Sequence, residues 1–213
     1  DIRTEGTRIF AQAGASLAKI AAEALRNSLT GFEFAAGIPG TLGGACIMNA
    51  GAYGGEMKDV LESVTVLDGQ GDIRVLPREE LDMGYRTSRA AREGYIVLEA
   101  VIALEPGDES KIREKLEDLK ERRTSKQPLE YPSAGSTFKR PEGYFAGKLI
   151  QDAGLRGLRV GDAMVSEKHC GFVINCGSAT AADVDRLIRQ VQERVRENSG
   201  VTLEPEVKRL GEF

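Results

Sequence analysis

Ser136 and Lys139 are spaced three residues apart in the segment YPSAGSTFKRP, residues 131–141. This S-x-x-K spacing occurs in penicillin-recognising acyl transferases, which also carry S-D-N and K-T-G motifs. Neither companion motif occurs in this chain. A Ser-His-Asp triad is also poorly supported, because there is no G-x-S-x-G motif and His169 is the only histidine. Ser136 is thus a weak nucleophile candidate, and its hydroxyl would suit proton donation to a very basic partner such as an enolate.

The segment GIPGTLGG, residues 37–44, is rich in glycine but is neither a G-x-G-x-x-G motif nor a P-loop, which requires a lysine. Its backbone N–H groups, near an expected helix start at Thr41, would suit an anion or the polar edge of a planar ring. The alternative, at about even odds, is a turn in which glycine allows two elements to pack closely.

Arg86 and a pair of glutamates are further candidates. Arg86 follows a glycine in LDMGYRTSR and is either a surface residue or, if it points inward, a ligand for a carboxylate. Glu204 and Glu206 share one face of an expected last strand, whose alternative role is a solvated edge that Pro205 would fit. For His169 we expect a partly buried side chain flanking a strand rather than a catalytic base.

Composition excludes several classes of function. A net charge of −4 argues against a protein that binds the nucleic-acid backbone. Three cysteines without a C-x-x-C pair, together with one histidine, argue against a disulfide framework or a metal site and favour a reducing compartment. The sequence contains no apolar run near the roughly 20 residues of a membrane span. We therefore expect a cytoplasmic protein with no metal and with neither nucleic acid nor membrane as partner.

The elements that position these residues follow from apolar periodicity and turn residues. A composition shift near residue 125, with helix-breaking prolines at 128 and 132, divides the chain into domains 1–124 and 125–213. Strands and helices mix without strict alternation, which indicates an α+β fold. The expected helices are 16–29, 108–124, 144–155 and 181–198; the expected strands are 7–14, both arms of a hairpin over 62–76, 95–107, 168–177 and 201–210; and 31–55 is expected to be rich in loops.

Five longer motifs carry a family resemblance: GIPGTLGGACIMNAGAYGGE, MGYRTSR, QPLEYPSAGSTFKRPEGYFAGKLIQDAGLRG, VSEKHCGFVIN and LEPEVKRLG. In order and spacing, the chain resembles the UDP-N-acetylenolpyruvoylglucosamine reductases of bacterial cell-wall synthesis (the MurB family) over nearly its whole length. The resemblance implies the C-terminal part of a PCMH-type FAD-binding domain, followed by a MurB C-terminal-type α/β substrate-binding domain. The family's GGGSN-like loop, which holds the FAD pyrophosphate, is not in this sequence, so we expect the chain to begin inside the FAD domain.

The resemblance also implies an activity. An NADPH-dependent FAD enzyme of this family reduces UDP-N-acetylglucosamine enolpyruvate to UDP-N-acetylmuramate for peptidoglycan. The family's catalytic residues fall on Arg86, which would pair with the substrate carboxylate, Ser136, which would donate a proton, and Glu206, which would polarise the carboxyl group. Glu206 is preferred to Glu204 because the family motif ends in Glu-Val, as Glu206-Val207 does.

The resemblance assigns the binding residues as well. For the substrate they are Tyr85, Lys126, Lys139 and Arg140, with both lysines meeting the diphosphate. Arg140 departs from the family, which often has asparagine there. For FAD they are Gly37, Ile38, Pro39, Gly40, Thr41, Gly43, Gly44, Asn49, Ala50, Gly51 and Tyr53.

Two alternatives remain open at the level of sequence. One is an oxidase built on the same FAD domain, against which the substrate-half motifs argue. The other is that this fragment alone is a UDP-sugar-binding module without bound FAD or activity. We expect a monomer in either case.

Overall fold

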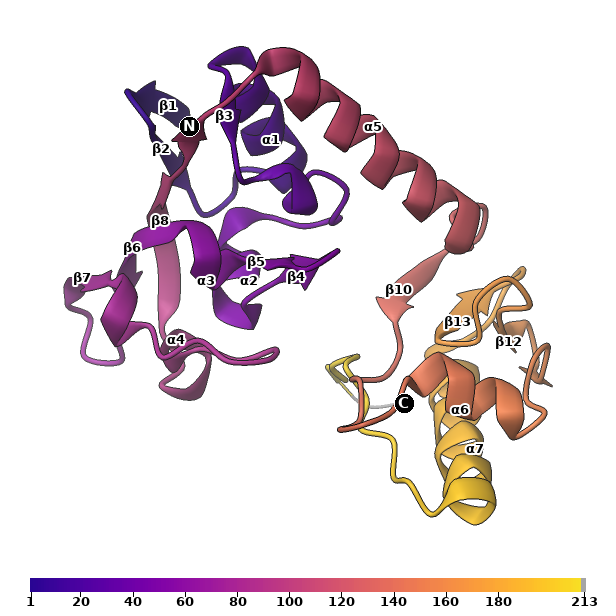
Figure 1. The fold of residues 1–213 in the computed structure, drawn as a ribbon. Helices are drawn as coiled ribbons and strands as arrows, with labels where there is room; N and C mark the ends of the chain where they lie inside the picture. Colours follow the sequence, from indigo (N-terminus) through magenta and orange to yellow (C-terminus); the bar gives the residue numbers. More distant parts are fainter. Residues whose placement is uncertain (212–213) are drawn as a thin grey trace. The chain divides into compact units, whose positions relative to one another are not determined.

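The computed structural model describes residues 1–211, and the chain divides between Arg123 and Thr124 into two compact units. Each unit has its own cluster of buried apolar side chains. The highly charged helix α5 (Glu109–Lys126) runs across the division, and Ile112 is its one buried residue (Figure 1). Each unit is described below on its own.

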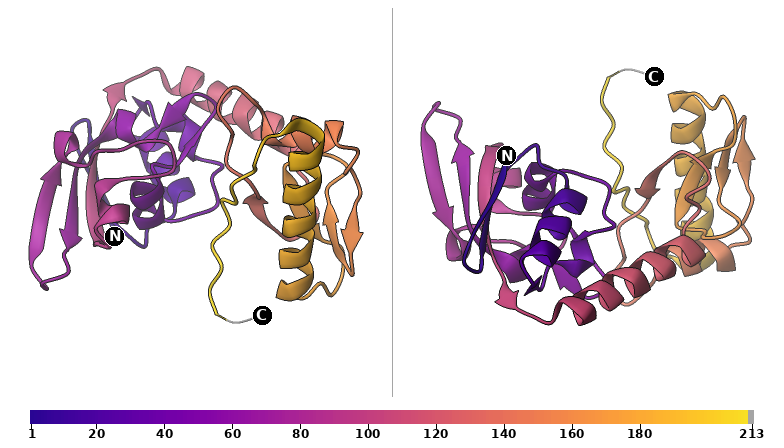
Figure 2. Two further views of the ribbon diagram at one scale, coloured as in Figure 1. Left: turned by 90° about the horizontal axis from the view of Figure 1, so that it is seen from below. Right: turned by 90° about the horizontal axis from the view of Figure 1, so that it is seen from above.

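The first unit is built on an antiparallel five-stranded sheet. Ile9 pairs with Ile102 and Ala11 with Ala100, so these four buried side chains lie on one face of the sheet. Helices α1 (Leu17–Arg26) and α2 (Leu42–Met48) cover the sheet (Figure 2). In sheet order the strands are β1 (Ile2–Glu5), β2 (Arg8–Gln12), β8 (Ile96–Ala103), β6 (Leu61–Leu67) and β7 (Ile73–Pro77).

Short elements fill the connections of this unit. Two two-stranded ladders and two single-turn helices lie between the longer elements. Ser16, which precedes α1, caps this helix by accepting a hydrogen bond from the Lys19 N–H at 3.3 Å. The short elements are β3 (Leu29–Thr30) paired with β9 (Glu105–Pro106), β4 (Gly51–Ala52) paired with β5 (Gly55–Glu56), α3 (Met57–Val60), α4 (Arg89–Arg92), and the 3₁₀ turns Glu33–Ala35 and Arg78–Glu80.

The second unit packs two helices on an antiparallel four-stranded sheet. Helices α6 (Ala146–Asp152) and α7 (Ala181–Ser199) contact one another (Figure 1). A capping box between Thr180 and Asp183 starts α7, and Gly200 ends it at φ +74°, a left-handed conformation that glycine adopts easily. In sheet order the strands are β10 (Ser133–Ser136), β13 (Phe172–Asn175), β12 (Ala163–Val165) and β11 (Arg159–Val160).

The four expected helices and the hairpin over 62–76 are confirmed. The strand expected over 201–210 is wrong, because this segment forms only a single bridge, between Phe138 and Pro205. Proline has no N–H to donate to a ladder, so pairing stops there. Strand β1 was not expected, and the segment 31–55 contains more regular structure than a loop-rich pattern indicates, above all helix α2.

The C-terminal segment is fastened to α7 by two polar contacts. The Gln192 amide donates to the Leu203 carbonyl at 2.8 Å, and the buried Asp185 carboxylate pairs with Arg189 at 2.7 Å and with Arg209 at 2.5 Å. Burial by itself raises the pKa of Asp185, but the hydrogen bond from Arg189 and the charge of Arg209 outweigh it. The pKa of this carboxyl therefore lies below its ordinary value.

We expect Asp185→Asn to lower the free energy of unfolding by about 1–3 kcal/mol at neutral pH, because charge-assisted hydrogen bonds are lost. Since the folded-state pKa is depressed, the difference is fully present above the unfolded pKa of about 4 and disappears as the pH falls through the lower folded value. Urea unfolding of the original protein and of Asp185→Asn between pH 3 and 7 measures this difference in the free energy of unfolding. Asp152→Asn, which breaks only the exposed pair with Lys148, is the control. A pH-independent difference would contradict this account.

Candidate functional site

Ser136 ends strand β10, and the residue after it fixes its position. Thr137 is buried, its N–H donates to the Gly171 carbonyl at 2.8 Å, and its Oγ1 accepts from the Val173 N–H at 2.9 Å. Ser136 itself is exposed and pairs in register with Phe172. The serine hydroxyl is thus carried on a rigid backbone at the surface of the second unit.

The C-terminal segment brings Glu206 to the same place. Its N–H donates to the Thr137 carbonyl at 2.9 Å, and two residues away the Lys139 N–H donates to the Glu204 carbonyl at 2.8 Å. These two bonds flank the bridge between Phe138 and Pro205. The structure therefore places Glu206 beside the residue that follows Ser136, although about 70 positions separate them in the sequence.

The cations of the loop after Ser136 already have protein partners. The Lys139 ammonium pairs with the Glu204 carboxylate. The Arg140 guanidinium lies 4.0 Å from the centre of the Phe145 ring, and its Nε donates to the Tyr144 carbonyl at 3.2 Å. Arg140 thus supports the following turn, a role that its sequence position did not indicate. Lys126, the third cation predicted to bind the substrate, is the exposed last residue of α5.

Arg86 belongs to the first unit and lies on a two-residue turn. The N–H and C=O groups of Gly84 and Thr87 pair with each other at 3.1 and 3.3 Å, and Tyr85 and Arg86 lie between them. Arg86 has φ +55°, a left-handed conformation that is unfavourable for a residue with a long side chain. Its guanidinium carbon lies 5.0 Å from the centre of the Tyr85 ring. The turn thus fixes the backbone from which the half-buried Arg86 side chain starts.

The glycine-rich segment presents backbone rather than charge. Thr41 is the N-cap of α2, as the sequence predicted for a helix start. Gly37, Gly40 and Gly44 are exposed, and a Cβ added at Gly40 would meet nothing within 4 Å. Residues 37–54 contain no charged side chain. This surface therefore offers backbone groups and uncharged side chains, and a flat group could approach it closely.

Arg123 lies against this segment and was not singled out from the sequence. Its guanidinium is 5.9 Å from the centre of the exposed Tyr53 ring, and its Nε lies 2.9 Å from the place a Cβ on Gly37 would occupy. It belongs to the charged helix α5, whose uniform polarity gave no signal for one functional arginine. Arg123 therefore supplies a cation beside two of the predicted FAD-lining residues.

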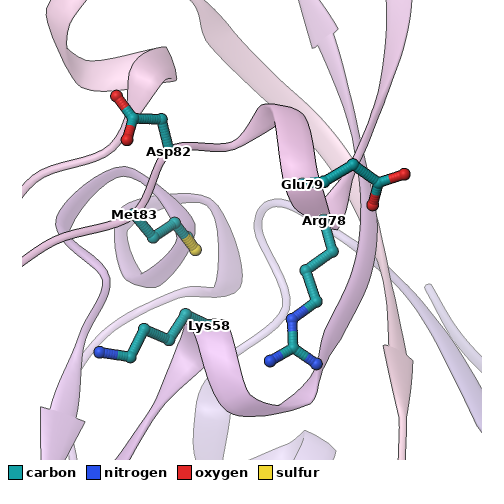
Figure 3. Close-up of a pocket in the computed structure, with 5 residues that line it drawn as sticks. All are labelled: Lys58, Arg78, Glu79, Asp82 and Met83. Carbon is teal, nitrogen blue, oxygen red and sulfur yellow. The ribbon is translucent and has the colours of Figure 1, made fainter.

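A separate hollow of about 350 Å³ opens on the first unit (Figure 3). It is lined by Lys58, Arg78, Glu79, Asp82 and Met83, and the Met83 side chain points into it. Lys58 is paired with Glu56, and Asp82 is paired with Arg92. None of the predicted site residues lines this hollow, and two of its charged groups are neutralised by neighbours.

The remaining observations concern His169, metal-ligating side chains and membrane-spanning helices. His169 is half-buried, its Nδ1 accepts from the Gly171 N–H at 3.0 Å, and its pKa is lowered by burial, in agreement with the structural role expected for it. Over residues 1–211 there is no cluster of histidine, cysteine and acidic side chains suited to a metal. Within the same residues, no helix is both long and apolar enough to cross a membrane.

Comparison with known proteins decides the family. A family model described as "UDP-N-acetylenolpyruvoylglucosamine reductase, C-terminal domain" matches residues 127–210, and an FAD binding domain model matches residues 1–76. A UDP-N-acetylenolpyruvoylglucosamine reductase of Lachnoclostridium phytofermentans is 61% identical over 208 residues, which cover 98% of this chain and 67% of the relative. The chain belongs to the UDP-N-acetylenolpyruvoylglucosamine reductase family.

Other members of the family agree. Reductases of Agathobacter rectalis and Clostridium perfringens are 62% and 58% identical, and the matches cover 65% and 69% of those proteins. The crystal structure of the enzyme from Thermus caldophilus superposes with a TM-score of 0.84 at 41% identity, over 93% of this chain and 71% of that one. The chain thus spans about two thirds of the length of its reductase relatives.

We expect Thr137→Val to destabilise the second unit by about 1–3 kcal/mol, because it leaves the buried Val173 N–H without an acceptor while preserving the shape of the side chain. Denaturant unfolding monitored by circular dichroism measures the change. Thr202→Val, at an exposed position, is the matched control and should change the free energy of unfolding by less than about 0.5 kcal/mol. Equal effects of the two substitutions would show that Thr137 does not fasten the Ser136 strand.

Proposed function

We propose that this chain carries out the reaction for which its family is named, the NADPH-dependent reduction of UDP-N-acetylglucosamine enolpyruvate to UDP-N-acetylmuramate in peptidoglycan synthesis. The observation that carries the proposal is the backbone bridge that brings Glu206 beside the Ser136 loop. It joins, within one unit, an acid and a hydroxyl that the sequence assigned separately to the same chemistry. The reaction adds a hydride and a proton across a carbon–carbon double bond.

The residues present fit FAD. The exposed glycine backbone at Gly37 and Gly40, the Tyr53 ring and the cation of Arg123 together offer close approach, a stacking surface and a positive charge. Of the other predicted lining residues, Gly43 is packed against Ala13, so its backbone supports the segment from behind. Bound FAD would supply the hydride chemistry, with NADPH as the reductant.

Arg86 is assigned to the substrate carboxylate. A planar guanidinium matches the two oxygens of a carboxylate, and its charge stabilises the enolate-like electron density that develops there when hydride adds to the far carbon of the double bond. The left-handed backbone of Arg86 fits such a role, because strained conformations persist where the surrounding structure enforces them. Tyr85, exposed on the same turn, is assigned to the substrate as well.

Ser136 is assigned the proton transfer. A serine hydroxyl is a poor acid near neutral pH, but the carbon beside the carboxylate of an enolate is basic enough to accept its proton. Glu206, fastened beside Thr137, is assigned to the same carboxyl group, where it acts favourably when it is protonated or bridged. The two side chains would then complete the reaction from one end of the second unit.

The cations of the second unit are assigned to the diphosphate of the substrate. Lys139 is paired with Glu204 and would exchange this carboxylate for phosphate oxygens on binding. Lys126 and Arg140 are the other two, although Arg140 also supports the Phe145 turn. We further propose that the protein acts in the cytoplasm, since its three cysteines are all free thiols, as in a reducing compartment, and that it acts as a monomer.

We expect Ser136→Ala to slow reduction of the enolpyruvyl substrate by about a hundredfold or more, because general acid catalysis is lost, while NADPH still reduces the flavin at the original rate. Stopped-flow absorbance at the flavin maximum separates the two half-reactions when the protein is studied as its gene encodes it. Ser133→Ala, at the exposed start of the same strand, is the matched control and should leave both rates within about twofold.

Normal substrate reduction by Ser136→Ala would remove the proposed proton donor. Equal slowing of both half-reactions would instead point to a disturbed flavin site. If the unaltered protein binds UDP-sugar but holds no flavin and oxidises no NADPH, the chain is a binding module and the proposed reaction is wrong.

A further inference from the structure

The turn that carries Arg86 is fastened at its first residue by the side chain of Asn49. The Asn49 Nδ2 donates to the Gly84 carbonyl at 3.0 Å, across 35 positions of sequence. Gly84 is the residue whose N–H and C=O close the turn by pairing with Thr87. The start of the Arg86 turn is therefore set from the end of helix α2, where Asn49 is the C-cap.

The amide nitrogen and the amide oxygen of the Asn49 side chain both form hydrogen bonds within the protein. Asn49 is 1% exposed and has φ +43°, a left-handed conformation that asparagine tolerates better than most residues. Its second amide hydrogen is used by Glu56, whose Oε2 lies 2.8 Å from Nδ2, and its Oδ1 accepts from the Lys58 N–H at 2.9 Å. Both amide hydrogens are thus used within the protein, so the side chain of Asn49 has no donor left for a cofactor.

A second fastening holds the other end of the turn to the same helix. The buried Ser88 hydroxyl donates to the Ile47 carbonyl at 2.8 Å and accepts from the Ala91 N–H at 3.1 Å, which caps α4. Residues on both sides of Arg86 are therefore bonded to consecutive parts of one helix end. Such a double attachment explains how a left-handed arginine can persist in the turn.

The same network includes the negative charge of Glu56. Glu56 accepts from Asn49 and pairs with the Lys58 ammonium at 2.8 Å. The pKa of the Glu56 carboxyl lies below its ordinary value, mainly through the hydrogen bond with Lys58, with further lowering by Asn49 and by the charge of Arg86. Glu56 therefore remains ionised as an acceptor for Asn49 and Lys58.

We propose that Asn49 is a positioning residue for Arg86, acting through the Gly84 carbonyl, rather than a residue whose side chain contacts FAD. The assignment rests on the proposed function, because it gives Asn49 a part in handling the substrate carboxylate. It also gives a physical link between the glycine-rich segment that includes Asn49 and the turn that includes Arg86. A change at Asn49 should therefore affect the substrate half-reaction and not the reduction of the flavin.

Asn49→Asp is the decisive variant. Aspartate keeps the acceptor for the Lys58 N–H and tolerates the left-handed backbone, but it loses both donors and repels Glu56. We expect a tenfold to hundredfold slower substrate half-reaction and flavin reduction within twofold of the original rate, because small displacements of a substrate-binding group have effects of this size. Asn49→Gly, which retains the backbone conformation and removes the side chain, should act in the same direction.

Asn175→Asp is the matched control, since the Asn175 Oδ1 only accepts, from the Gly177 and Ala179 N–H groups, and aspartate preserves both bonds. A double-mutant cycle adds a readout that general destabilisation would not produce. In an Arg86→Ala background, Asn49→Asp should slow the substrate half-reaction by less than twofold further, because the group that it positions is gone.

Hydrogen exchange of residues 84–88, followed by mass spectrometry, tests the placement without using activity. We expect exchange about tenfold faster in Asn49→Asp and unchanged in Asn175→Asp. Unchanged exchange in Asn49→Asp, or an additive effect in the Arg86→Ala background, overturns the inference. If the unaltered protein fails to reduce the enolpyruvyl substrate, the proposed function is wrong, and the positioning role of Asn49 is wrong with it. Normal turnover by Asn49→Asp would overturn the positioning role alone.

Discussion

The backbone and side chain of Thr137 make three hydrogen bonds, two to the stretch around β13 and one to the C-terminal segment, and the candidate residues of the second unit depend on them. Its N–H reaches Gly171, its hydroxyl oxygen accepts from Val173, and its carbonyl accepts from Glu206. Because Thr137 is buried, each of these groups would be destabilising if left unpaired. The position of Ser136 and the position of Glu206 are consequently set by the same residue, and neither can shift without breaking bonds shielded from water.

The first unit places Arg86 in a comparable way. There the buried side chains are Asn49 and Ser88, and the element they attach to is the end of helix α2. In both units a residue with proposed chemistry lies on an exposed loop or strand end, and a buried polar neighbour in the sequence or across a turn fixes that loop to the core. Residues on exposed loops are thereby held in precise positions by a small number of buried polar groups that all have hydrogen-bond partners.

Local patterns predicted much of the fold. The apolar spacing of α1 and α7, the cap at Ser16 and the alternation of the hairpin over 62–76 depend on neighbours within a few residues, which the sequence displays directly. The last expected strand failed because its pairing partner lies far away in the chain and Pro205 ends the ladder. Alternation alone carries no information about how many ladder bonds a distant partner will provide.

The residues of the candidate site were found by their match to family motifs, while the residues that hold them were not. Thr137, Ser88 and Arg123 have ordinary types at positions without a spacing signal, and their importance appears only when their distant partners are known. Lys139 and Arg140 stay predicted substrate-binding residues, and the sequence could not show that Glu204 and Phe145 are their partners within the protein. Long-range polar contacts of this kind depend on the tertiary fold, not on local pattern.

The central claim is that the chain passes reducing equivalents from NADPH to an enolpyruvyl UDP-sugar through bound FAD. One anaerobic absorbance measurement tests this claim most directly. The protein as its gene encodes it is first bleached with one equivalent of NADPH and then mixed with UDP-N-acetylglucosamine enolpyruvate. The account predicts that the oxidised flavin spectrum returns fully, with formation of one equivalent of UDP-N-acetylmuramate. A flavin that remains reduced in the presence of this substrate, and is reoxidised only when oxygen is admitted, would contradict it.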